Sequence, residues 1–169
     1  MVAAAAPREP RARQVVAALA QVMDPEMPGV SIAALGMVHA VEVERDHVHI
    51  TLLPTFVGCP ALDVMRANVV SQVSRATGLV PDAIMVEYSA AVPWTSDRVA
   101  PSCHRALLSR GIAPPPPAAD SIMTEMPHVA CPWCGSADTV SEGVFGPTAC
   151  RSLYYCRACR NPFEAMKPV

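Results

Sequence analysis

The chain has 169 residues, of which 51% are hydrophobic and 17% charged, and its formal net charge is −2. This composition excludes a chain that is disordered throughout, and the lack of a basic excess argues against nucleic acid as a partner. No apolar run approaches the roughly 20 residues that span a bilayer, so we expect a cytoplasmic protein with no membrane partner. The seven cysteines include two Cys-x-x-Cys pairs, which favours reduced thiols and a metal over a disulfide framework.

The first half of the chain alternates helix and strand patterns. Residues 1–10, MVAAAAPREP, form a tail of small residues that we expect to be disordered. Apolar residues then recur at helical spacing over residues 11–23, and Asp24-Pro25 is expected to end that helix. Residues 41–43 and 48–52 alternate between apolar and polar side chains, which predicts a hairpin. We interpret His47 and His49 as part of its solvated face rather than as a metal site.

A second helix and a third strand complete the first domain. After Pro60, apolar residues spaced by three and four predict an amphipathic helix that ends near Gly78. Residues 84–88 alternate as a strand, and residues 99–111 form a last helix in which Cys103 is expected to serve packing. The order α-β-β-α-β-α over residues 11–112 predicts an α+β domain with a small mixed sheet backed by helices.

Proline and then cysteine dominate the rest of the chain. The run Pro114 to Pro117 favours polyproline geometry and predicts a semi-rigid linker over residues 113–128. Residues 129–169 are too few to build a core of their own, and such a segment usually needs a metal. Four basic and three acidic side chains give this segment only a weak electrostatic footprint for nucleic acid.

Two Cys-x-x-Cys pairs carry the strongest local signal. Each pair can present both sulfurs from one turn, and 21 residues between the pairs suit a four-cysteine zinc ribbon. We therefore predict one structural zinc ion, while a rubredoxin-like iron or an iron–sulfur cluster remains open. Cys150 is a fifth thiol, which could be a buried small residue, an extra ligand or a redox thiol. The predicted ligands are Cys131, Cys134, Cys156 and Cys159.

The segment LPTFVGCPALDVM, residues 53–65, places a lone thiol where a strand ends and a helix begins. Pro60 suits the first helical position, so we predict that Cys59 lies at or beside the N-cap, where backbone N–H groups favour a thiolate. Gly58 is expected to allow an unusual backbone angle. The alternative is that Cys59 is only a small residue that fills a cap site. We expect Asp24 and Thr55 near the start of this helix.

These motifs together resemble a known family. DPEMPGVSIAALGMV (24–38), LPTFVGCPALDVM (53–65) and VPWTSDRV (92–99) resemble the MIP18 (DUF59) family, whose members take part in iron–sulfur cluster assembly or target delivery. GIAPP (111–115), CPWCGS (131–136), FGPTAC (145–150) and NPFEAMK (161–167) resemble the family of D subunits of phenylacetyl-CoA epoxidase. The match runs from about residue 11 to residue 168.

The resemblance implies a non-catalytic accessory factor of a multicomponent oxygenase rather than an enzyme. It implies that Cys59 is the functional thiol or the contact for an iron–sulfur cluster, which would be transient if it binds, and that Asp24 and Thr55 occupy flanking motif positions. The implied partners are the oxygenase or reductase subunits of the epoxidase, or iron–sulfur assembly proteins, and self-association is left open. The alternative function is a redox protein that passes electrons through the Cys-x-x-Cys metal site. A nucleic-acid-binding ribbon is the third possibility.

Overall fold

The computed structural model describes residues 10–27, 29–116 and 127–168, and the chain forms two compact units. The first unit comprises the chain up to Pro54 together with Pro60–Val92, and the second comprises Thr55–Cys59 together with Pro93–Val169. Most of the predicted tail and linker falls in residues 1–9 and 117–126, which lie outside the described residues. The predicted domain boundaries therefore stay predictions.

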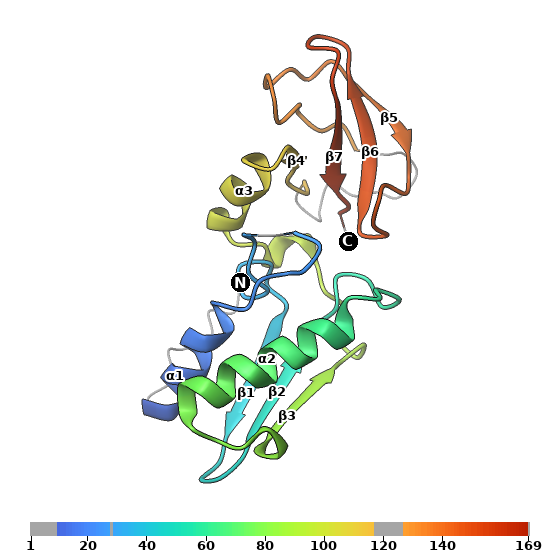
Figure 1. Cartoon of the computed structure of the whole chain (residues 1–169). Coiled ribbons are helices and arrows are strands. Elements are labelled where there is room, and N and C mark those ends of the chain that lie inside the picture. Colours follow the sequence, from blue (N-terminus) through green and yellow to red (C-terminus); the bar gives the residue numbers. More distant parts are fainter. Residues whose placement is uncertain (1–9, 28, 117–126, 169) are drawn as a thin grey trace. The chain divides into compact units, whose positions relative to one another are not determined.

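The first unit is a three-stranded sheet with two helices on one of its faces (Figure 1). Strands β1 and β2 are antiparallel, and β3 pairs with β2 in parallel, so the sheet is mixed as predicted. The elements of this unit are α1 (Pro10–Leu19), β1 (Val38–Val43), β2 (Val48–Leu52), α2 (Leu62–Thr77), the 3₁₀ turn η1 (Pro81–Ala83) and β3 (Ile84–Tyr88).

The two faces of this sheet differ in polarity, as strand alternation dictates. On the side of the helices, β2 buries Val48, Ile50 and Leu52, which share a core with residues of α2 that include Met65 and Val69. The opposite face carries polar side chains in register across the strands. His49 lies 3.8 Å from Glu42 and 3.4 Å from Glu87, and Thr51 donates to Glu87 over 3.3 Å. This face is the polar strand face expected from the alternation.

Helix α1 ends at Leu19, four residues before the predicted end at Met23. The backbone N–H groups of Gln21 and Val22 bond three residues back, which tightens the last turn. Met23 then forms an antiparallel bridge with Ser31, and the N–H of Ile32 donates to the carbonyl of Val22 over 3.0 Å. Pairing with residues later in the chain therefore takes precedence over the helical pattern of residues 20–23.

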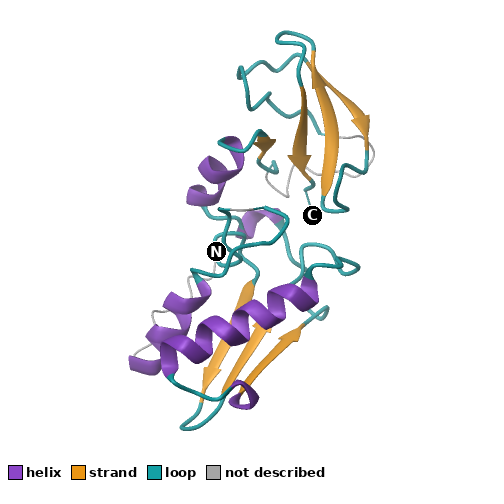
Figure 2. Ribbon diagram, viewed as in Figure 1, coloured by secondary structure: helices purple, strands orange, loops and turns teal. Residues whose placement is uncertain are grey.

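The second unit contains a short helix and a four-stranded sheet in the order β4-β7-β6-β5. Strands β5, β6 and β7 form an antiparallel meander, and the two-residue strand β4 joins its edge parallel to β7 (Figure 2). The elements of this unit are the 3₁₀ turn η2 (Ser96–Arg98), α3 (Pro101–Leu108), β4 (Ile112–Ala113), β5 (Thr139–Gly143), β6 (Arg151–Cys156) and β7 (Pro162–Met166). The predicted order α-β-β-α-β-α is confirmed along the chain, with α3 as its last helix.

A small cluster of side chains forms the core of this sheet. The rings of Tyr154 and Phe163 stack with centroids 5.6 Å apart, and the hydroxyl of Tyr154 donates to the carbonyl of Pro127 over 2.8 Å. Two cysteines complete this core: its members are Ala113, Val129, Cys131, Tyr154, Cys156, Phe163 and Ala165. Tyr154 and Phe163 thus serve the packing of the ribbon. In neither unit does a described helix reach the length and apolarity that a membrane crossing requires.

Candidate functional site

Four cysteine sulfurs of the second unit converge on one point. Cys131 and Cys134 precede β5, Cys156 ends β6, and Cys159 lies in the turn before β7. The sulfurs of all four lie within 4.8 Å of one another. Those of Cys131 and Cys159 are 3.7 Å apart, and those of Cys134 and Cys156 are 3.6 Å apart. A tetrahedral ion with metal–sulfur bonds of about 2.3 Å separates its ligands by about 3.8 Å, so this four-cysteine site fits such an ion.

Two turns of the same shape hold the sulfurs. In the first turn, the N–H of Gly135 donates to the carbonyl of Cys131 over 2.8 Å. In the second turn, the N–H of Arg160 donates to the carbonyl of Cys156 over 2.8 Å. Gly135 has a φ of 75°, and Arg160 has a φ of 61°, in the left-handed region that L residues adopt at a cost. Glycine suits this angle at position 135, whereas the residue type at position 160 gives no indication of it.

Burial and hydrogen bonds shift the pKa values of Cys134 and Cys159 in opposite directions. Burial opposes a thiolate at Cys159, but N–H groups of Asn161 and the neighbouring thiols outweigh it and lower the pKa of Cys159 to about 6. At Cys134 the backbone N–H of Ser136 favours the thiolate. Burial and hydrogen bonds with the other cysteines outweigh it and raise the pKa of Cys134 to about 12. The first thiolate therefore forms at Cys159, and a metal that binds the site displaces protons from its neighbours.

Cys59 lies in an exposed turn of the second unit. Its N–H donates to the carbonyl of Phe56 over 3.2 Å, and its side chain is half-buried, while Phe56 and Val57 are exposed. Helix α2 begins at Leu62 with Ala61 as its N-cap, so Cys59 lies two residues before the N-cap and the prediction that it lies at or beside the N-cap is wrong. The bond from the N–H of Cys59 to the carbonyl of Phe56 closes a separate turn before the helix, so the first helical residue comes later in the sequence than predicted.

Gly58 serves this turn through its missing side chain rather than through its backbone angle. It is not among the glycines with positive φ, so the expected unusual angle is not adopted. A Cβ atom at this position would lie 3.1 Å from Cε1 of the Phe56 ring. The glycine therefore leaves room for Phe56 beside the thiol.

Two of the three residues predicted to lie together near the start of the helix, Thr55 and Cys59, share one segment of the chain. Thr55 and Cys59 belong to the same segment, Thr55–Cys59, which we call the Cys59 loop, and this loop is part of the second unit. Asp24 belongs to the first unit, so its proximity to Cys59 stays a prediction. Asp24 is 6% exposed, and its Oδ1 accepts the N–H groups of Glu26 over 2.8 Å and Met27 over 3.0 Å. These bonds give the carboxylate a role in its own turn.

The remaining thiols lie apart from the four-cysteine site. Cys150 immediately precedes β6, and Cys156 ends that strand, so six extended residues separate the two by roughly 20 Å. The structure therefore does not bring Cys150 to the site as an extra ligand. Its sulfur lies 3.3 Å from Oγ1 of Thr148 in a buried position. Cys103 is 1% exposed within α3, in agreement with its predicted packing role. All seven cysteines are thiols rather than disulfides.

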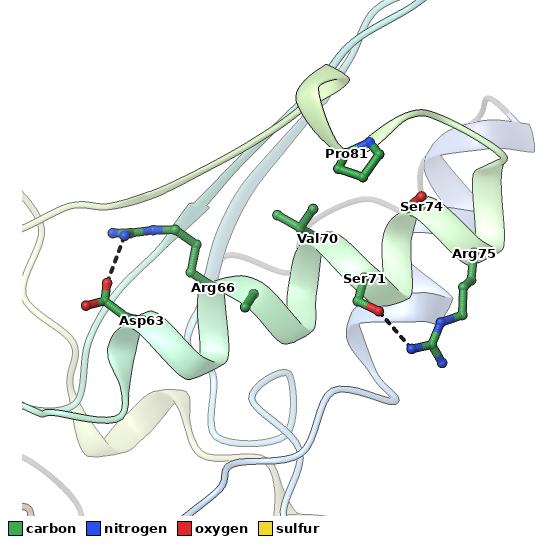
Figure 3. Close-up of a pocket in the computed structure, with 8 residues that line it drawn as sticks. Asp63, Arg66, Val70, Ser71, Ser74, Arg75 and Pro81 are labelled. Atoms are coloured by element: carbon green, nitrogen blue, oxygen red, sulfur yellow. Dashed lines mark hydrogen bonds and ion pairs between the residues drawn. The ribbon is translucent and has the colours of Figure 1, made fainter.

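A surface groove runs along α2 in the first unit (Figure 3). Its charged side chains already have neighbours on the helix: Arg66 pairs with Asp63 over 2.9 Å, and Arg75 donates to Ser71 over 2.8 Å. Its other lining residues are Ala67, Val70, Ser74 and Pro81, so no cysteine or histidine faces it. Thiol and metal chemistry is thus confined to other parts of the molecule.

Comparison with known proteins assigns both halves of the sequence. Residues 12–84 match a family described as iron–sulfur cluster assembly proteins, and residues 115–167 match the PaaD zinc beta ribbon domain. A protein of Escherichia coli (strain K12), provisionally named as the D subunit of 1,2-phenylacetyl-CoA epoxidase, is 35% identical over 161 residues, which are 95% of this chain and 94% of the relative. The chain belongs to this family of D subunits.

Further relatives match the first domain. The Fe-S protein maturation auxiliary factor YitW of Bacillus subtilis (strain 168) is 35% identical over 88 residues, which are 50% of this chain and 81% of that protein. The crystal structure of a DUF59 domain from Bacillus anthracis superposes with a TM-score of 0.51 at 29% identity, covering 56% of this chain and 88% of that one. The predicted MIP18-like fold followed by a zinc ribbon is therefore confirmed.

Proposed function

We propose that the protein is a non-catalytic maturation factor of the phenylacetyl-CoA ring-1,2-epoxidase in aerobic phenylacetate degradation. In this proposal it assists the assembly of an iron–sulfur or di-iron centre in a partner protein, and Cys59 is the thiol that handles the metal centre. The observation that carries the proposal is the match along almost the whole chain to a D subunit, in which an iron–sulfur assembly segment precedes the ribbon.

The four-cysteine site is proposed to hold one zinc ion with a structural role. Four thiolates suit zinc, and the sulfur separations of 3.6 and 3.7 Å suit a tetrahedral ion. Cys131 and Cys156 belong to the core of the sheet, so an ion bound to their sulfurs stabilises the packing of that core. Bound zinc supplies a fixed tetrahedral link between the two turns and carries no electrons, because it has no redox chemistry.

Cys59 is proposed to contact the metal centre that is delivered, which is cargo rather than a resident cofactor. Its side chain is half-buried, and the exposed residues Phe56 and Val57 precede it in the same loop. A thiol in such a position is open to a partner protein, whereas Cys103 and Cys150 are buried. The Cys59 loop therefore combines a ligand atom with apolar surface that a partner can cover.

A Cys59→Ser variant tests this role in anaerobic reconstitution with the purified oxygenase and reductase subunits. We expect the variant to keep its fold and its zinc, and to lose the ability to raise the iron and sulfide content and the epoxidase activity of the partners. Cys150→Ser is the matched control, because it removes a different thiol of the same unit. Normal metal loading of the partners by the Cys59 variant would refute the proposal.

Metal and sulfide analysis of the anaerobically purified protein separates this function from electron transfer. One zinc ion per chain and no visible absorbance are expected for the maturation factor. Iron in the four-cysteine site, with a coloured and reducible spectrum, would instead identify a redox protein. The same analysis of Cys59→Ser distinguishes a cluster bound through Cys59 from one bound in the ribbon.

A further inference from the structure

Trp133 lies between two of the four site cysteines and touches a glycine outside the ribbon turn. An ideal Cβ on Gly111 would lie 2.1 Å from Cζ2 and 2.3 Å from Cη2 of the Trp133 indole. The ring therefore packs directly onto the backbone of Gly111. Gly111 also has a φ of 72°, so two independent constraints require glycine at this position.

Both ends of Trp133 are tied to the ribbon. Its backbone lies in the turn between Cys131 and Cys134, and its indole Nε1 donates to the carbonyl of Pro162 over 3.3 Å. Pro162 is the first residue of β7, the strand that follows Cys159. The orientation of the indole thus depends on the turn that presents two sulfurs and on the strand that follows a third.

Gly111 joins helix α3 to strand β4. Its N–H donates to the carbonyl of Leu108, the last residue of α3, over 3.0 Å. The next two residues form β4, in which Ile112 pairs with Glu164 and Ala113 with Ala165 of β7. Residues 101–113, which we call the α3–β4 segment, therefore contact the ribbon through a two-residue ladder, through Ala113 in the ribbon core and through the indole at Gly111.

We propose that Trp133 is a positioning residue that couples metal binding at the four-cysteine site to the packing of the α3–β4 segment. An ion bound by Cys131 and Cys134 fixes the chain on both sides of Trp133, and the fixed indole covers Gly111. Without the ion the turn loses its anchor, the indole leaves Gly111, and the short ladder of β4 with the buried Ala113 holds the segment less firmly. This coupling requires a bound metal and is independent of the role proposed for Cys59.

Cys103 provides a reporter for this coupling, because it is 1% exposed within α3 and lies outside the metal site. Its alkylation by iodoacetamide, followed by mass spectrometry of the zinc-loaded full-length chain, measures how often the α3–β4 segment opens. We expect Trp133→Ala to raise the alkylation rate of Cys103 at least roughly tenfold, which corresponds to about 1.4 kcal/mol. Zinc content and the protection of Cys150 should be unchanged.

The conservative variant and zinc removal give further readouts. Trp133→Phe keeps a ring over Gly111 and loses the N–H that reaches Pro162, so it should restore most of the protection of Cys103. Removal of zinc from the wild-type protein by a chelator should expose Cys103. An unchanged rate at Cys103 in zinc-loaded Trp133→Ala would overturn the proposal. So would equal exposure of Cys103 and Cys150 in that variant, because the indole would then support the whole unit.

Two glycine variants separate the contact from backbone strain. Gly111→Ala adds a Cβ that collides with the indole, whereas Gly78→Ala adds one that meets no atom within 4 Å, and both glycines have φ near 73° (72° and 74°). We expect Gly111→Ala to expose Cys103 with zinc still bound, and Gly78→Ala to leave Cys103 protected. Protection of Cys103 in both variants would overturn the proposed contact.

Discussion

The sulfur atoms of Cys134 and Cys156 lie 3.6 Å apart, although 22 positions separate the two residues in the sequence. The other close pair, Cys131 and Cys159, spans 28 positions and lies at 3.7 Å. Each close pair takes one sulfur from each Cys-x-x-Cys turn. An ion at this point therefore links the segment before β5 to the turn between β6 and β7, and neither turn alone completes the site.

Removal of one exposed ligand should empty the four-cysteine site. Cys134 is exposed, so Cys134→Ser removes a thiolate with little loss of packing. We expect zinc affinity to fall at least about 100-fold, because the loss of a mere outer-shell partner already costs 10- to 100-fold. Competition with a chromophoric chelator measures the affinity. Cys150→Ser is the control and should bind zinc normally, and an unchanged affinity in Cys134→Ser would rule out the four-cysteine site.

Acid should release the metal, because protons compete with it for the thiolates. The pKa of Cys134 near 12 means that this thiol is protonated at neutral pH and must lose its proton on binding. The pKa of Cys159 near 6 means that protons compete with the metal for this sulfur only below about pH 6. Zinc affinity should therefore fall as the pH falls, and more steeply below about pH 6. An affinity that is constant between pH 8 and pH 5 would contradict these proton positions.

The carboxylate of Asp24 should contribute to stability through its turn. It accepts two backbone N–H groups in a buried position, so Asp24→Ala should lower the free energy of unfolding by about 1–3 kcal/mol. Asp24→Asn keeps an oxygen acceptor and should cost less than Asp24→Ala. Urea unfolding of the zinc-loaded protein measures both values. Equal stability of wild type and Asp24→Ala, combined with lost metal delivery, would instead favour a functional role for the carboxylate.

An ion pair between the buried Arg151 and the partly exposed Glu164 should stabilise the ribbon at the end opposite the metal. Nη1 of Arg151 lies 2.5 Å from Oε2 of Glu164, and Nε of Arg151 donates to Thr148 over 2.7 Å. Glu164→Ala leaves the guanidinium without this partner and should cost about 3 kcal/mol. Arg151→Met combined with Glu164→Leu should cost less than Glu164→Ala, because no charge is left uncompensated. Thermal unfolding of zinc-loaded variants tests this order, and the reverse order would contradict it.

The thiols should differ in reactivity according to their exposure. Cys59 is half-buried in a turn, whereas Cys103 is 1% exposed in a helix that must open first. We expect iodoacetamide to modify Cys59 at least roughly tenfold faster than Cys103 in the zinc-loaded wild type. Quantitative mass spectrometry of the two peptides gives the ratio. A ratio near one would show that Cys59 is not accessible to a partner in the way that we propose.

Regular patterns in the sequence were sufficient for the elements whose signals are local. Apolar residues spaced by three and four positions predicted α2 and its end near Gly78, which has the left-handed φ of a C-cap. Alternation placed β2 and β3, and the two Cys-x-x-Cys pairs identified all four residues that the structure brings together. In each case the signal comes from residues a few positions apart; for the metal site these are the two cysteines of each Cys-x-x-Cys pair.

Contacts between distant residues decided the features that sequence reasoning missed. Residues 20–23 leave the helical pattern because Met23 pairs with Ser31. Ile112 and Ala113 form the strand β4 because they pair with the edge of β7, some 50 residues later. The sequence at this point predicted the start of a linker. The left-handed angle of Arg160 follows from the turn that presents Cys159, and no preference of arginine predicts it.

The path of the chain between the two units has a consequence for how the protein can be divided. The backbone passes from one unit to the other three times, after Pro54, after Cys59 and after Val92. A recombinant fragment that stops at Val92 would carry Cys59 without the neighbours of its loop, and a fragment that starts at Pro93 would lack the thiol altogether. Complementation with separately expressed halves should therefore fail unless the two pieces reassemble.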